Sequence, residues 1–271
     1  MKKQFKLGII GCGFMAHAII KGICDKEFLR PKKIVVSDVD GDKLQGVADE
    51  FGINVTKDNR AVAEQSEYLL LAVKPQGFEE VAKQLSGVCP EKVISIMAGV
   101  KKATIKNSFG VGLIKVARCM PNLPCACACG MMGVDMSDYN RNTDDIEFIY
   151  NLFSCLGEVL STEESKLDAV TGISGSGPAY VFYFIDSLID AGVKQGLSRD
   201  EAKLLAVQTV FGSCLMLSED ERSLPELISS VCSKGGTTIE AIKVFEEKNF
   251  RGVIDEAVGA CVRRSKELSD K

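Results

Sequence analysis

A glycine-rich turn near the start of the chain has the spacing needed to cradle a dinucleotide. The segment Gly11 to Ala16 reads G-x-G-x-x-A and joins an expected strand to an expected helix. Gly11 permits the tight turn, Gly13 lets a pyrophosphate approach the backbone, and Ala16 allows the helix to pack closely on the strand. Free N–H groups at the helix start would face the phosphates. The expected cofactor contacts here are Gly11, Gly13, Phe14, Met15 and Ala16; the alternative is a turn that serves packing alone.

The end of the second expected strand bears on the choice of cofactor. Asp38 stands about twenty residues beyond the turn, where an acidic side chain accepts hydrogen bonds from ribose hydroxyls and favours NAD. Ser37 and Lys43 offer the alternative of binding the extra phosphate of NADP. Asp38 can also be a turn residue within the segment 38–41, Asp-Val-Asp-Gly. The residues therefore predict NADPH or NADH as cofactor and leave the preference open.

Three further loops follow expected strands, at the carboxyl edge where ligands bind in sheets of this kind. They span residues 72–76, 97–100 and 119–122. Lys74 can reach a ribose, and Asn122 can donate a hydrogen bond to a carboxamide or to the substrate. Taken singly, each is better interpreted as an ordinary loop residue. The expected cofactor contacts in these loops are Ala72, Val73, Lys74, Pro75, Ala98, Gly99 and Asn122.

Strands alternate with amphipathic helices in the first half of the chain. Strands are expected at 6–10, 33–37, 68–73, 92–96 and 112–118, and helices at 14–24 and 42–51, the latter ended by Gly52. The unbroken apolar run at 68–73 is typical of a strand covered on both faces. This alternation predicts right-handed β-α-β units and a Rossmann-like, doubly wound, mainly parallel sheet.

The second half of the chain changes to a helical period. Helices are expected at 180–194, 198–217, 224–231, 237–247 and 250–267. Ser198 and Glu201 have the spacing of a capping box, and Thr237 or Thr238 can cap the helix that follows. We therefore expect a dinucleotide-binding α/β domain over residues 1–160 and an all-α domain over residues 161–271.

The helical half contains two segments rich in small residues. Residues 169–180 place glycines and serines just before a long apolar helix, which suits close backbone approach to a ligand or another chain. Residues 231–238 form a small-residue loop that leads into a helix, so N–H groups and hydroxyls gather where a carboxylate can bind. The alternative for the second segment is a capped helix start with no ligand.

Composition excludes several classes of protein. The 271 residues carry a net charge of -4 with both signs mixed, which gives no electrostatic footprint for nucleic acid or anionic membrane. No apolar run reaches membrane-spanning length, and the short basic start leads into no signal-peptide core. Eleven cysteines scattered through expected helices and strands fit a reducing, cytoplasmic compartment better than a disulfide framework.

A metal site is conceivable around Cys125, Cys127 and Cys129, with Cys119 nearby. However, alternate residues share one face of a strand, whereas structural zinc sites use wider spacing within a turn. We therefore interpret these cysteines as small strand residues and expect no metal. His17, the chain's only histidine, is expected to be a surface or groove residue on the first helix.

Together these segments resemble the pyrroline-5-carboxylate reductase family over essentially the whole chain. The resemblance rests on several separate motifs in the same order. They are the Gly11 turn continuing into Met15-Ala16, Val73-Lys74-Pro75, Arg118 to Asn122, Ser174 to Tyr180, and a C-terminal signature from Leu224 to Glu246. One position departs from the family pattern: Lys234 stands where proline is common, adding a cation beside the proposed carboxylate loop.

The resemblance implies reduction of 1-pyrroline-5-carboxylate to L-proline by NAD(P)H, the last step of proline synthesis. It also implies a homodimer through the helical domain, with dimers often forming a ring. It places Thr171 near the ring nitrogen as the catalytic residue and the substrate at Ser233, Gly235, Gly236, Thr237 and Thr238. An iminium accepts hydride more readily than a neutral imine, so we expect Thr171 to act as a hydrogen-bond donor and relay to water.

Two other functions are compatible with parts of the chain. A β-hydroxyacid dehydrogenase shares the two-domain plan but relies on a Lys-x-x-Asn pair, which occurs nowhere in this sequence. A non-catalytic NAD(P)H sensor would use the helical domain to bind a partner. The loop at 233–238 argues against the sensor, which needs no carboxylate pocket.

Overall fold

The computed structural model describes residues 3–109, 113–139 and 142–269. The chain forms two compact units: the first is Met1–Ser176 with Cys261–Lys271, and the second is Gly177–Ala260. The last strand ends at Ser161, close to the expected boundary at residue 160. The compact division nevertheless falls at Ser176, because the segment after that strand packs back on the sheet: Val170 fills the space beside Gly133.

The first unit is built on one eight-stranded sheet with strand order β3-β2-β1-β4-β5-β6-β7-β8. Strands β1 to β6 run parallel, β7 pairs antiparallel with β6, and β8 is parallel to β7. The expected mainly parallel sheet is thus confirmed, although the strand expected at 112–118 begins at Lys115, with Gly112 outside the described residues. The strands are β1 Phe5–Ile10, β2 Ile34–Ser37, β3 Asn54–Thr56, β4 Ser66–Leu71, β5 Lys92–Ser95, β6 Lys115–Met120, β7 Gly130–Asp135 and β8 Gly157–Ser161.

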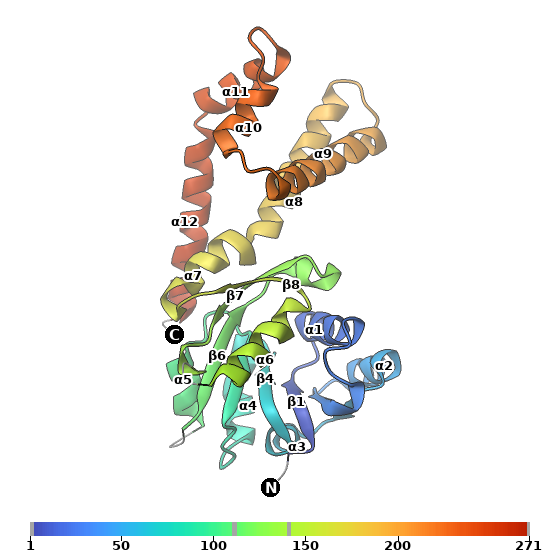
Figure 1. Cartoon of the computed structure of the whole chain (residues 1–271), viewed down its shortest axis with the longest axis vertical. Helices are drawn as coiled ribbons and strands as arrows, with labels where there is room; N and C mark the ends of the chain where they lie inside the picture. The colour runs from blue at the N-terminus through green and yellow to red at the C-terminus, as the bar shows by residue number, and fades with distance from the viewer. Residues whose placement is uncertain (1–2, 110–112, 140–141, 270–271) are drawn as a thin grey trace. The chain divides into compact units, whose positions relative to one another are not determined.

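Helices cover both faces of this sheet, as a doubly wound fold requires (Figure 1). One buried apolar cluster joins the sheet to α1, α2 and α6, and a second joins the other face to α3, α4 and α5. The helices are α1 Phe14–Asp25, α2 Gly41–Phe51, α3 Asn59–Gln65, α4 Phe78–Gln84, α5 Lys102–Ser108 and α6 Thr143–Ser154; short 3-10 turns are η1 Pro31–Lys33, η2 Pro75–Gly77, η3 Leu123–Cys127 and η4 Ser137–Tyr139.

Three short helical segments and the end of the last helix complete the first unit. They are the 3-10 turn η5 Glu164–Lys166, α7 Leu167–Val170, the π-helical turn η6 Thr171–Gly175, and the end of α12, which spans Phe250–Ser269. The Ser265 hydroxyl donates to Asp168 Oδ1 at 2.6 Å, which fastens α12 to α7. The Cys261 thiol lies 3.1 Å from the Ser176 hydroxyl, at the end of the π-helical turn.

The second unit is entirely helical, as expected. Its helices are α8 Gly177–Lys194, α9 Arg199–Glu219, α10 Leu224–Val231, α11 Thr237–Glu247 and the first part of α12. Ser198 and Glu201 form the expected capping box. The expected threonine cap of α11 is wrong: Gly236 occupies the cap position, no side chain caps the helix, and Thr237 is already its first residue.

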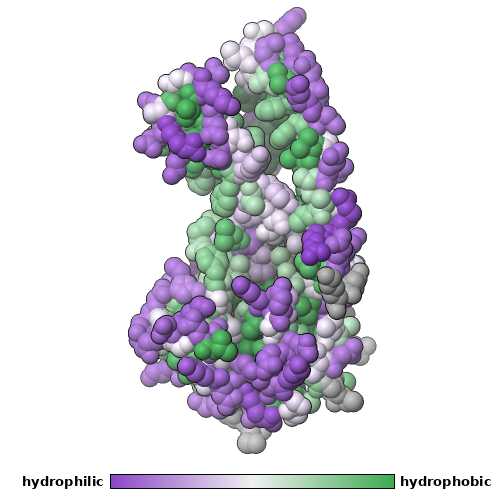
Figure 2. Space-filling view, turned by 180° about the vertical axis from the view of Figure 1, so that it is seen from behind, coloured by the Kyte–Doolittle hydropathy of each residue, from purple (hydrophilic) through white to green (hydrophobic). Residues whose placement is uncertain are grey.

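Most apolar side chains of the second unit are exposed. Within residues 177–260, which are all described, the buried hydrophobic residues are Ile189, Ala202 and Ala206. By contrast, Tyr183 on α8 is 76% exposed, and Leu204 and Phe211 on α9 are 72% and 62% exposed. Figure 2 shows apolar side chains across the visible surface of these helices. No helix in the described parts of the chain is long and apolar enough to cross a membrane.

Candidate active site

The loops predicted to bind the cofactor meet at the carboxyl edge of the parallel strands. The Gly11 N–H donates to Ser37 O at 2.8 Å, and the Ala72 N–H donates to Ile10 O at 2.9 Å. These bonds fix the loops after β1, β2 and β4 to one another. The chain continues from β1 to β2 on one side, while β4 flanks β1 on the other. Ligands of doubly wound folds bind at such a switch point.

The structure explains the two glycines of the first turn in different ways. Gly11 has φ of 100°, and a Cβ there would lie 2.8 Å from the Ala72 carbonyl carbon, so packing of the turn on the next loop demands glycine. Gly13 is exposed, and a Cβ on it would meet nothing within 4 Å. The space is open directly above the start of α1, which no side chain caps. The residues therefore fit a pyrophosphate approaching free N–H groups at the helix start.

The other residues of the turn either lie at the proposed pyrophosphate site or pack in the core. Phe14 is 58% exposed, Met15 is half-buried, and Ala16 is buried against the sheet. Phe14 and Met15 thus offer their backbone N–H groups at the helix start, whereas Ala16 serves packing. This distribution agrees with the roles that the motif predicts.

Asp38 is bonded to the glycine-rich turn itself. Its Oδ2 accepts the Cys12 N–H at 2.6 Å, and its Oδ1 accepts the Asp40 N–H at 2.9 Å. The turn-residue interpretation is therefore satisfied, yet each carboxylate oxygen keeps a further acceptor position for a hydroxyl. Burial, and then the charge of Asp38, raise the pKa of the Cys12 thiol to about 11. The end of β2 is thus a negatively charged environment.

Ser37 does not fit the expected phosphate role. Its side chain is fully buried, and its hydroxyl donates to Asn59 Oδ1 at 2.6 Å. A residue on the buried strand β2 cannot present its hydroxyl to a ligand without breaking that bond. Lys43 is exposed, and its ammonium pairs with Asp40 at 3.2 Å. Of the two, only Lys43 remains accessible to a phosphate.

The loops after β4 and β5 lie side by side. Ala72 and Val73 are half-buried, while Lys74 and Pro75 are exposed. In the second of these loops, Ala98 is exposed and Gly99 adopts φ of 75°. Gly99 packs on Leu268 of α12, whose nearest atoms lie 3.3 Å from where a Cβ on Gly99 would stand. The two loops border a cavity of about 740 Å³, which is lined among others by Lys74, Pro75, Phe78, Ala98, Gly99, Val100 and Leu268.

Asn122 is buried at the end of β6. Its Oδ1 accepts the Met131 N–H at 2.9 Å and so ties the loop to β7. The carboxamide oxygen is therefore structural, and only the amide nitrogen is left for the predicted donation to a ligand. Sequence alone did not reveal this tie, because β7 was not among the expected strands.

Thr171 opens the π-helical turn in the first unit. Its hydroxyl donates to Leu167 O at 2.8 Å, which leaves the oxygen's lone pairs as acceptors. Gly175 of the same turn packs on Met120, whose Cε lies 2.8 Å from where a Cβ on Gly175 would stand. This contact anchors the turn beside the end of β6, immediately before the Pro121-Asn122 loop. Single turns of π-helix occur frequently at functional sites.

The loop Ser233 to Thr238 belongs to the second unit. Gly235 has φ of 74°, and the Gly236 N–H donates to Ser233 O at 3.0 Å, forming a tight turn before α11. The Ser233 hydroxyl lies over Gly236, only 2.3 Å from where a Cβ would stand. Because no side chain caps α11, its first N–H groups are available. Ser233, Lys234, Gly235 and Thr237 are exposed, and Gly236 and Thr238 are half-buried.

A group of charged residues beside the loop after β5 and the end of β6, in the first unit, was not predicted from the sequence. Glu164 Oε1 accepts the Lys102 N–H at 2.7 Å and pairs with Arg118 at 3.2 Å. The Lys102 ammonium, nearly buried, pairs with Asp135 at 2.6 Å. Burial disfavours that ammonium, but the hydrogen bonds and negative charges of Asp135 and Asp138 together outweigh burial and raise the pKa of Lys102. The only signal in the sequence was Arg118, a charged residue within an expected buried strand.

The cysteine segment differs from its strand interpretation. Cys125 and Cys127 lie in the 3-10 turn η3, and Ala128 then reverses the chain with φ of 55° before β7. The prediction of period-two strand residues is therefore wrong, because the preceding proline starts a helical turn. Within the described residues, no group of three or more His, Cys, Asp or Glu side chains could hold a metal ion. His17 contacts Glu50 at 2.8 Å, at the surface.

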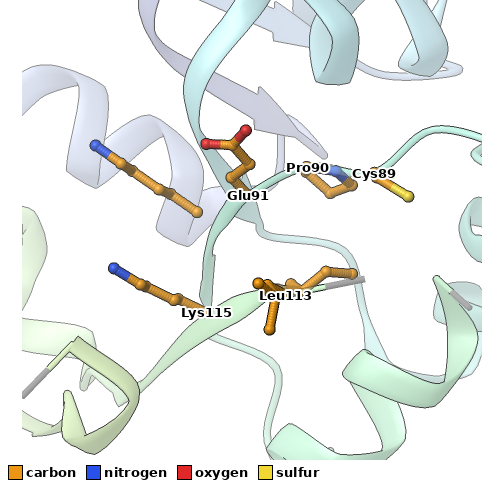
Figure 3. Close-up of a pocket in the computed structure, with 7 residues that line it drawn as sticks. Cys89, Pro90, Glu91, Leu113 and Lys115 are labelled. Atoms are coloured by element: carbon orange, nitrogen blue, oxygen red, sulfur yellow. The ribbon is translucent and has the colours of Figure 1, made fainter. Parts of the chain in front are cut away.

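A second cavity, of about 460 Å³, lies at the opposite edge of the sheet (Figure 3). It is lined by residues before β5 and at the start of β6: Cys89, Pro90, Glu91, Lys92, Leu113, Ile114 and Lys115. Lys92 there pairs with the buried Asp145 at 2.7 Å. Since these residues precede the parallel strands, the cavity is separate from the cofactor loops.

Comparisons with known proteins identify the family of this chain. Residues 164–268 match the family model for pyrroline-5-carboxylate reductase dimerisation, and residues 6–99 match that for NADP oxidoreductase, coenzyme F420-dependent. The chain is 40% identical over 269 residues to the pyrroline-5-carboxylate reductase of Synechocystis, covering 99% of this chain and 100% of that protein. The chain belongs to the pyrroline-5-carboxylate reductase family.

Solved structures of the pyrroline-5-carboxylate reductase family share the whole fold. The Coxiella burnetii enzyme has a TM-score of 0.90 and 33% identity, covering 98% of this chain and 99% of that one. The Plasmodium falciparum enzyme, solved with NADP bound, has a TM-score of 0.87 and 29% identity, covering 99% and 100%. The resemblance drawn from separate motifs is therefore confirmed. A family match spanning both halves leaves the β-hydroxyacid dehydrogenase alternative without support.

Proposed function

We propose that this protein reduces 1-pyrroline-5-carboxylate to L-proline with NAD(P)H, as the last step of proline synthesis. The observation that carries the proposal is the anchoring of the Thr171 turn beside the cofactor loops through Gly175 and Met120. A reductase of a cyclic imine needs a hydride donor and a polar group for the ring nitrogen at one place. Family membership and the open cradle at Gly13 support the same activity.

The cofactor is held by backbone groups more than by side chains. The first N–H groups of α1 would bind the pyrophosphate above Gly13, and Asp38 would accept hydroxyls of the adenosine ribose. Ala72 to Pro75, Ala98, Gly99 and the Asn122 amide would border the nicotinamide half. When bound, the nicotinamide supplies a hydride; the imine carbon gains that hydride and the nitrogen gains a proton, which gives proline and NAD(P)⁺.

Thr171 would orient the ring nitrogen. While its hydroxyl donates to Leu167 O, the Thr171 oxygen can accept a hydrogen bond from the protonated imine N–H. This arrangement favours the iminium, the form that accepts hydride most readily. We therefore propose that Thr171 acts as an acceptor in place of the expected donor role, and the bond to Leu167 supports this choice. Most of the acceleration would come from holding two reactants together.

The substrate carboxylate would bind the loop before α11. The Ser233 hydroxyl, the Gly236 to Thr238 amides and the Thr238 hydroxyl form a set of donors at a helix start, where the helix dipole favours an anion. Lys234 is exposed in the same loop and adds positive charge. The cation departs from the family pattern and would strengthen attraction of the anionic substrate.

The assembly we propose is a homodimer through the second unit, with a ring of dimers as the larger form. The exposed apolar residues of α8 and α9 support this arrangement, because isolated helices rarely leave so much apolar surface in water. We also propose a cytoplasmic location. All eleven cysteines are free, and a reducing compartment maintains such thiols.

The test is an initial-rate assay with pyrroline-5-carboxylate, beside the six-membered piperideine homologue, with each of NADH and NADPH. The proposal predicts rapid cofactor oxidation with the five-membered ring and L-proline as product by chiral chromatography. Tight cofactor binding without turnover of either ring would reject the reductase and favour a non-catalytic sensor.

A further inference from the structure

Glu164 occupies a junction between the three segments that border the proposed reaction centre. Its Oε1 accepts the Lys102 N–H at 2.7 Å and pairs with Arg118 at 3.2 Å. Lys102 is the first residue of α5, directly after the Gly99-Val100-Lys101 loop. Arg118 lies two residues before Met120 on β6. One carboxylate oxygen therefore joins the loop after β5 to the end of β6.

Glu164 is also continuous with the Thr171 turn. It begins η5, which leads through the four residues of α7 into Thr171. The far end of that turn rests on Met120 through Gly175. The segment 164–175 is thus attached to β6 at both ends, by Glu164 through Arg118 and by Gly175 through Met120. Between these ends the segment also contacts β7 through Val170 and α12 through Asp168, so loss of the first attachment would shift Thr171 rather than release it.

The surroundings make this junction rigid. The Arg118 side chain is 7% exposed and that of Glu164 is 29% exposed, so solvent screens this pair less than it screens a pair at the surface. On the far side of the first turn of α5, the Lys102 ammonium pairs with Asp135 of β7 and bonds to Ser137 at 2.6 Å. A charge-assisted bond to a backbone N–H at a helix start is both strong and directional.

From this geometry we infer that Glu164 is a positioning residue for hydride transfer. It sets the loop Met97 to Val100, which would border the nicotinamide, at a fixed place relative to Thr171, which would hold the imine. The inference rests on the proposed function. Glu164 itself touches neither reactant, so its removal should leave binding largely intact and misplace the two groups. A misplacement of about 1 Å can reduce turnover about a hundredfold.

The test compares Glu164→Ala, Glu164→Gln and Glu163→Ala. Glu163 is the matched control, because it is exposed and precedes Glu164 directly, and its side chain bonds only to the neighbouring Ser165 hydroxyl at 3.3 Å among the described residues. We expect kcat of Glu164→Ala to fall about tenfold to a hundredfold, with both KM values within about twofold of wild type. Glu164→Gln keeps an acceptor oxygen and should recover part of the loss, while Glu163→Ala should match wild type.

Two readouts separate positioning from a general loss of structure. The primary isotope effect on kcat with nicotinamide-deuterated cofactor should rise in Glu164→Ala, since misplaced reactants make hydride transfer more rate-limiting. Amide hydrogen exchange at Lys102 should quicken in the same variant. An unchanged isotope effect would overturn the inference. A fall in kcat accompanied by an equal rise in KM and a loss of thermal stability would overturn it as well. Absence of turnover in wild type would reject the proposed function and this inference together, whereas active wild type with an equally active Glu164→Ala rejects the inference alone.

Discussion

The two units of the chain differ in how they obtain a core. The first buries an apolar cluster on each face of its sheet, with residues such as Ile9, Ile19 and Phe153 fully enclosed. The second has long helices but few enclosed side chains, a small cluster around Ile189, Ala202 and Ala206. Its remaining apolar residues, Phe211 among them, face outward. The first unit buries its apolar clusters within its own fold, whereas the second requires another surface to cover its apolar residues.

The proposed cofactor contacts and the proposed carboxylate loop also lie in different units. Loops at the carboxyl edge of the first unit contain the proposed cofactor contacts, and the π-helical turn η6 contains Thr171; the core of this unit stabilises both. The proposed carboxylate loop, Ser233 to Thr238, lies in the unit that depends on association. Activity should therefore be lost in two distinguishable ways: through the cofactor edge with the assembly intact, or through the assembly with cofactor binding intact.

The largest effect should come from placing a charge on the exposed face of α9. Phe211 is 62% exposed in the single chain, and burial of such a side chain contributes about 2 kcal/mol for each of two symmetric copies. Phe211→Glu should weaken dimerisation about a thousandfold, as measured by sedimentation equilibrium. Leu113→Glu is the control, because Leu113 of the first unit is 98% exposed and should not affect assembly. An unchanged dimer in Phe211→Glu would disprove the proposed interface.

Thr171→Ala should produce the next largest effect, confined to turnover. Without the hydroxyl the protonated imine loses its acceptor, so kcat should fall on the order of 10²-fold while substrate KM changes little. Thr171→Ser keeps the oxygen and should retain most activity. Steady-state kinetics of the three proteins decides the matter, and a wild-type kcat in Thr171→Ala would exclude Thr171 from the mechanism.

The two glycines of the first turn should respond in opposite ways to alanine. Gly11→Ala should destabilise the first unit by about 1–3 kcal/mol, because of its positive φ and the Ala72 backbone 2.8 Å from the new Cβ. Gly13→Ala should leave thermal unfolding unchanged and raise the cofactor KM about tenfold, since its Cβ enters open space where the pyrophosphate would lie. Equal effects of both substitutions on Tm would contradict the proposed pyrophosphate site at Gly13.

The smallest of these effects should be a change of cofactor preference. Asp38→Ser removes a carboxylate that would repel a 2′-phosphate, so the ratio of kcat/KM for NADPH to that for NADH should rise by about tenfold. Lys43→Ala should shift the ratio the other way, because it removes the accessible cation. Ratios that stay constant in both variants would show that the end of β2 does not select the cofactor.

Patterns that are local in sequence were predicted well, and contacts between distant segments were not. The limits of α10 and α11, the Ser198 capping box and the alternating strands follow from periodicity and capping chemistry. The strands β3, β7 and β8 are short or follow irregular turns, and the helices α3 to α6 were likewise not among those expected. The alternating cysteines after Pro124 suggested a strand, whereas Pro124 lies in the first turn of a 3-10 helix.

The site shows the same division. The Gly11 to Ala16 turn could be recognised because its chemistry is encoded in six adjacent residues. Burial of Ser37, the bond from Thr171 to Leu167, and the Glu164 junction depend on tertiary packing, which no spacing encodes. The Asp38 bond to Cys12 joins residues far apart in the chain. The sequence therefore raised the question of NADH or NADPH preference without answering it.

Active-enzyme centrifugation tests the central claim, a reductase that works as an assembly, most directly. A thin band of enzyme sediments through pyrroline-5-carboxylate and NADH or NADPH, so that cofactor oxidation reports the size of the species that turns over. We predict an active band with at least twice the 29.3 kDa mass of one chain. An active band at the mass of a single chain would contradict the assembly, and a band that oxidises neither cofactor would contradict the reductase.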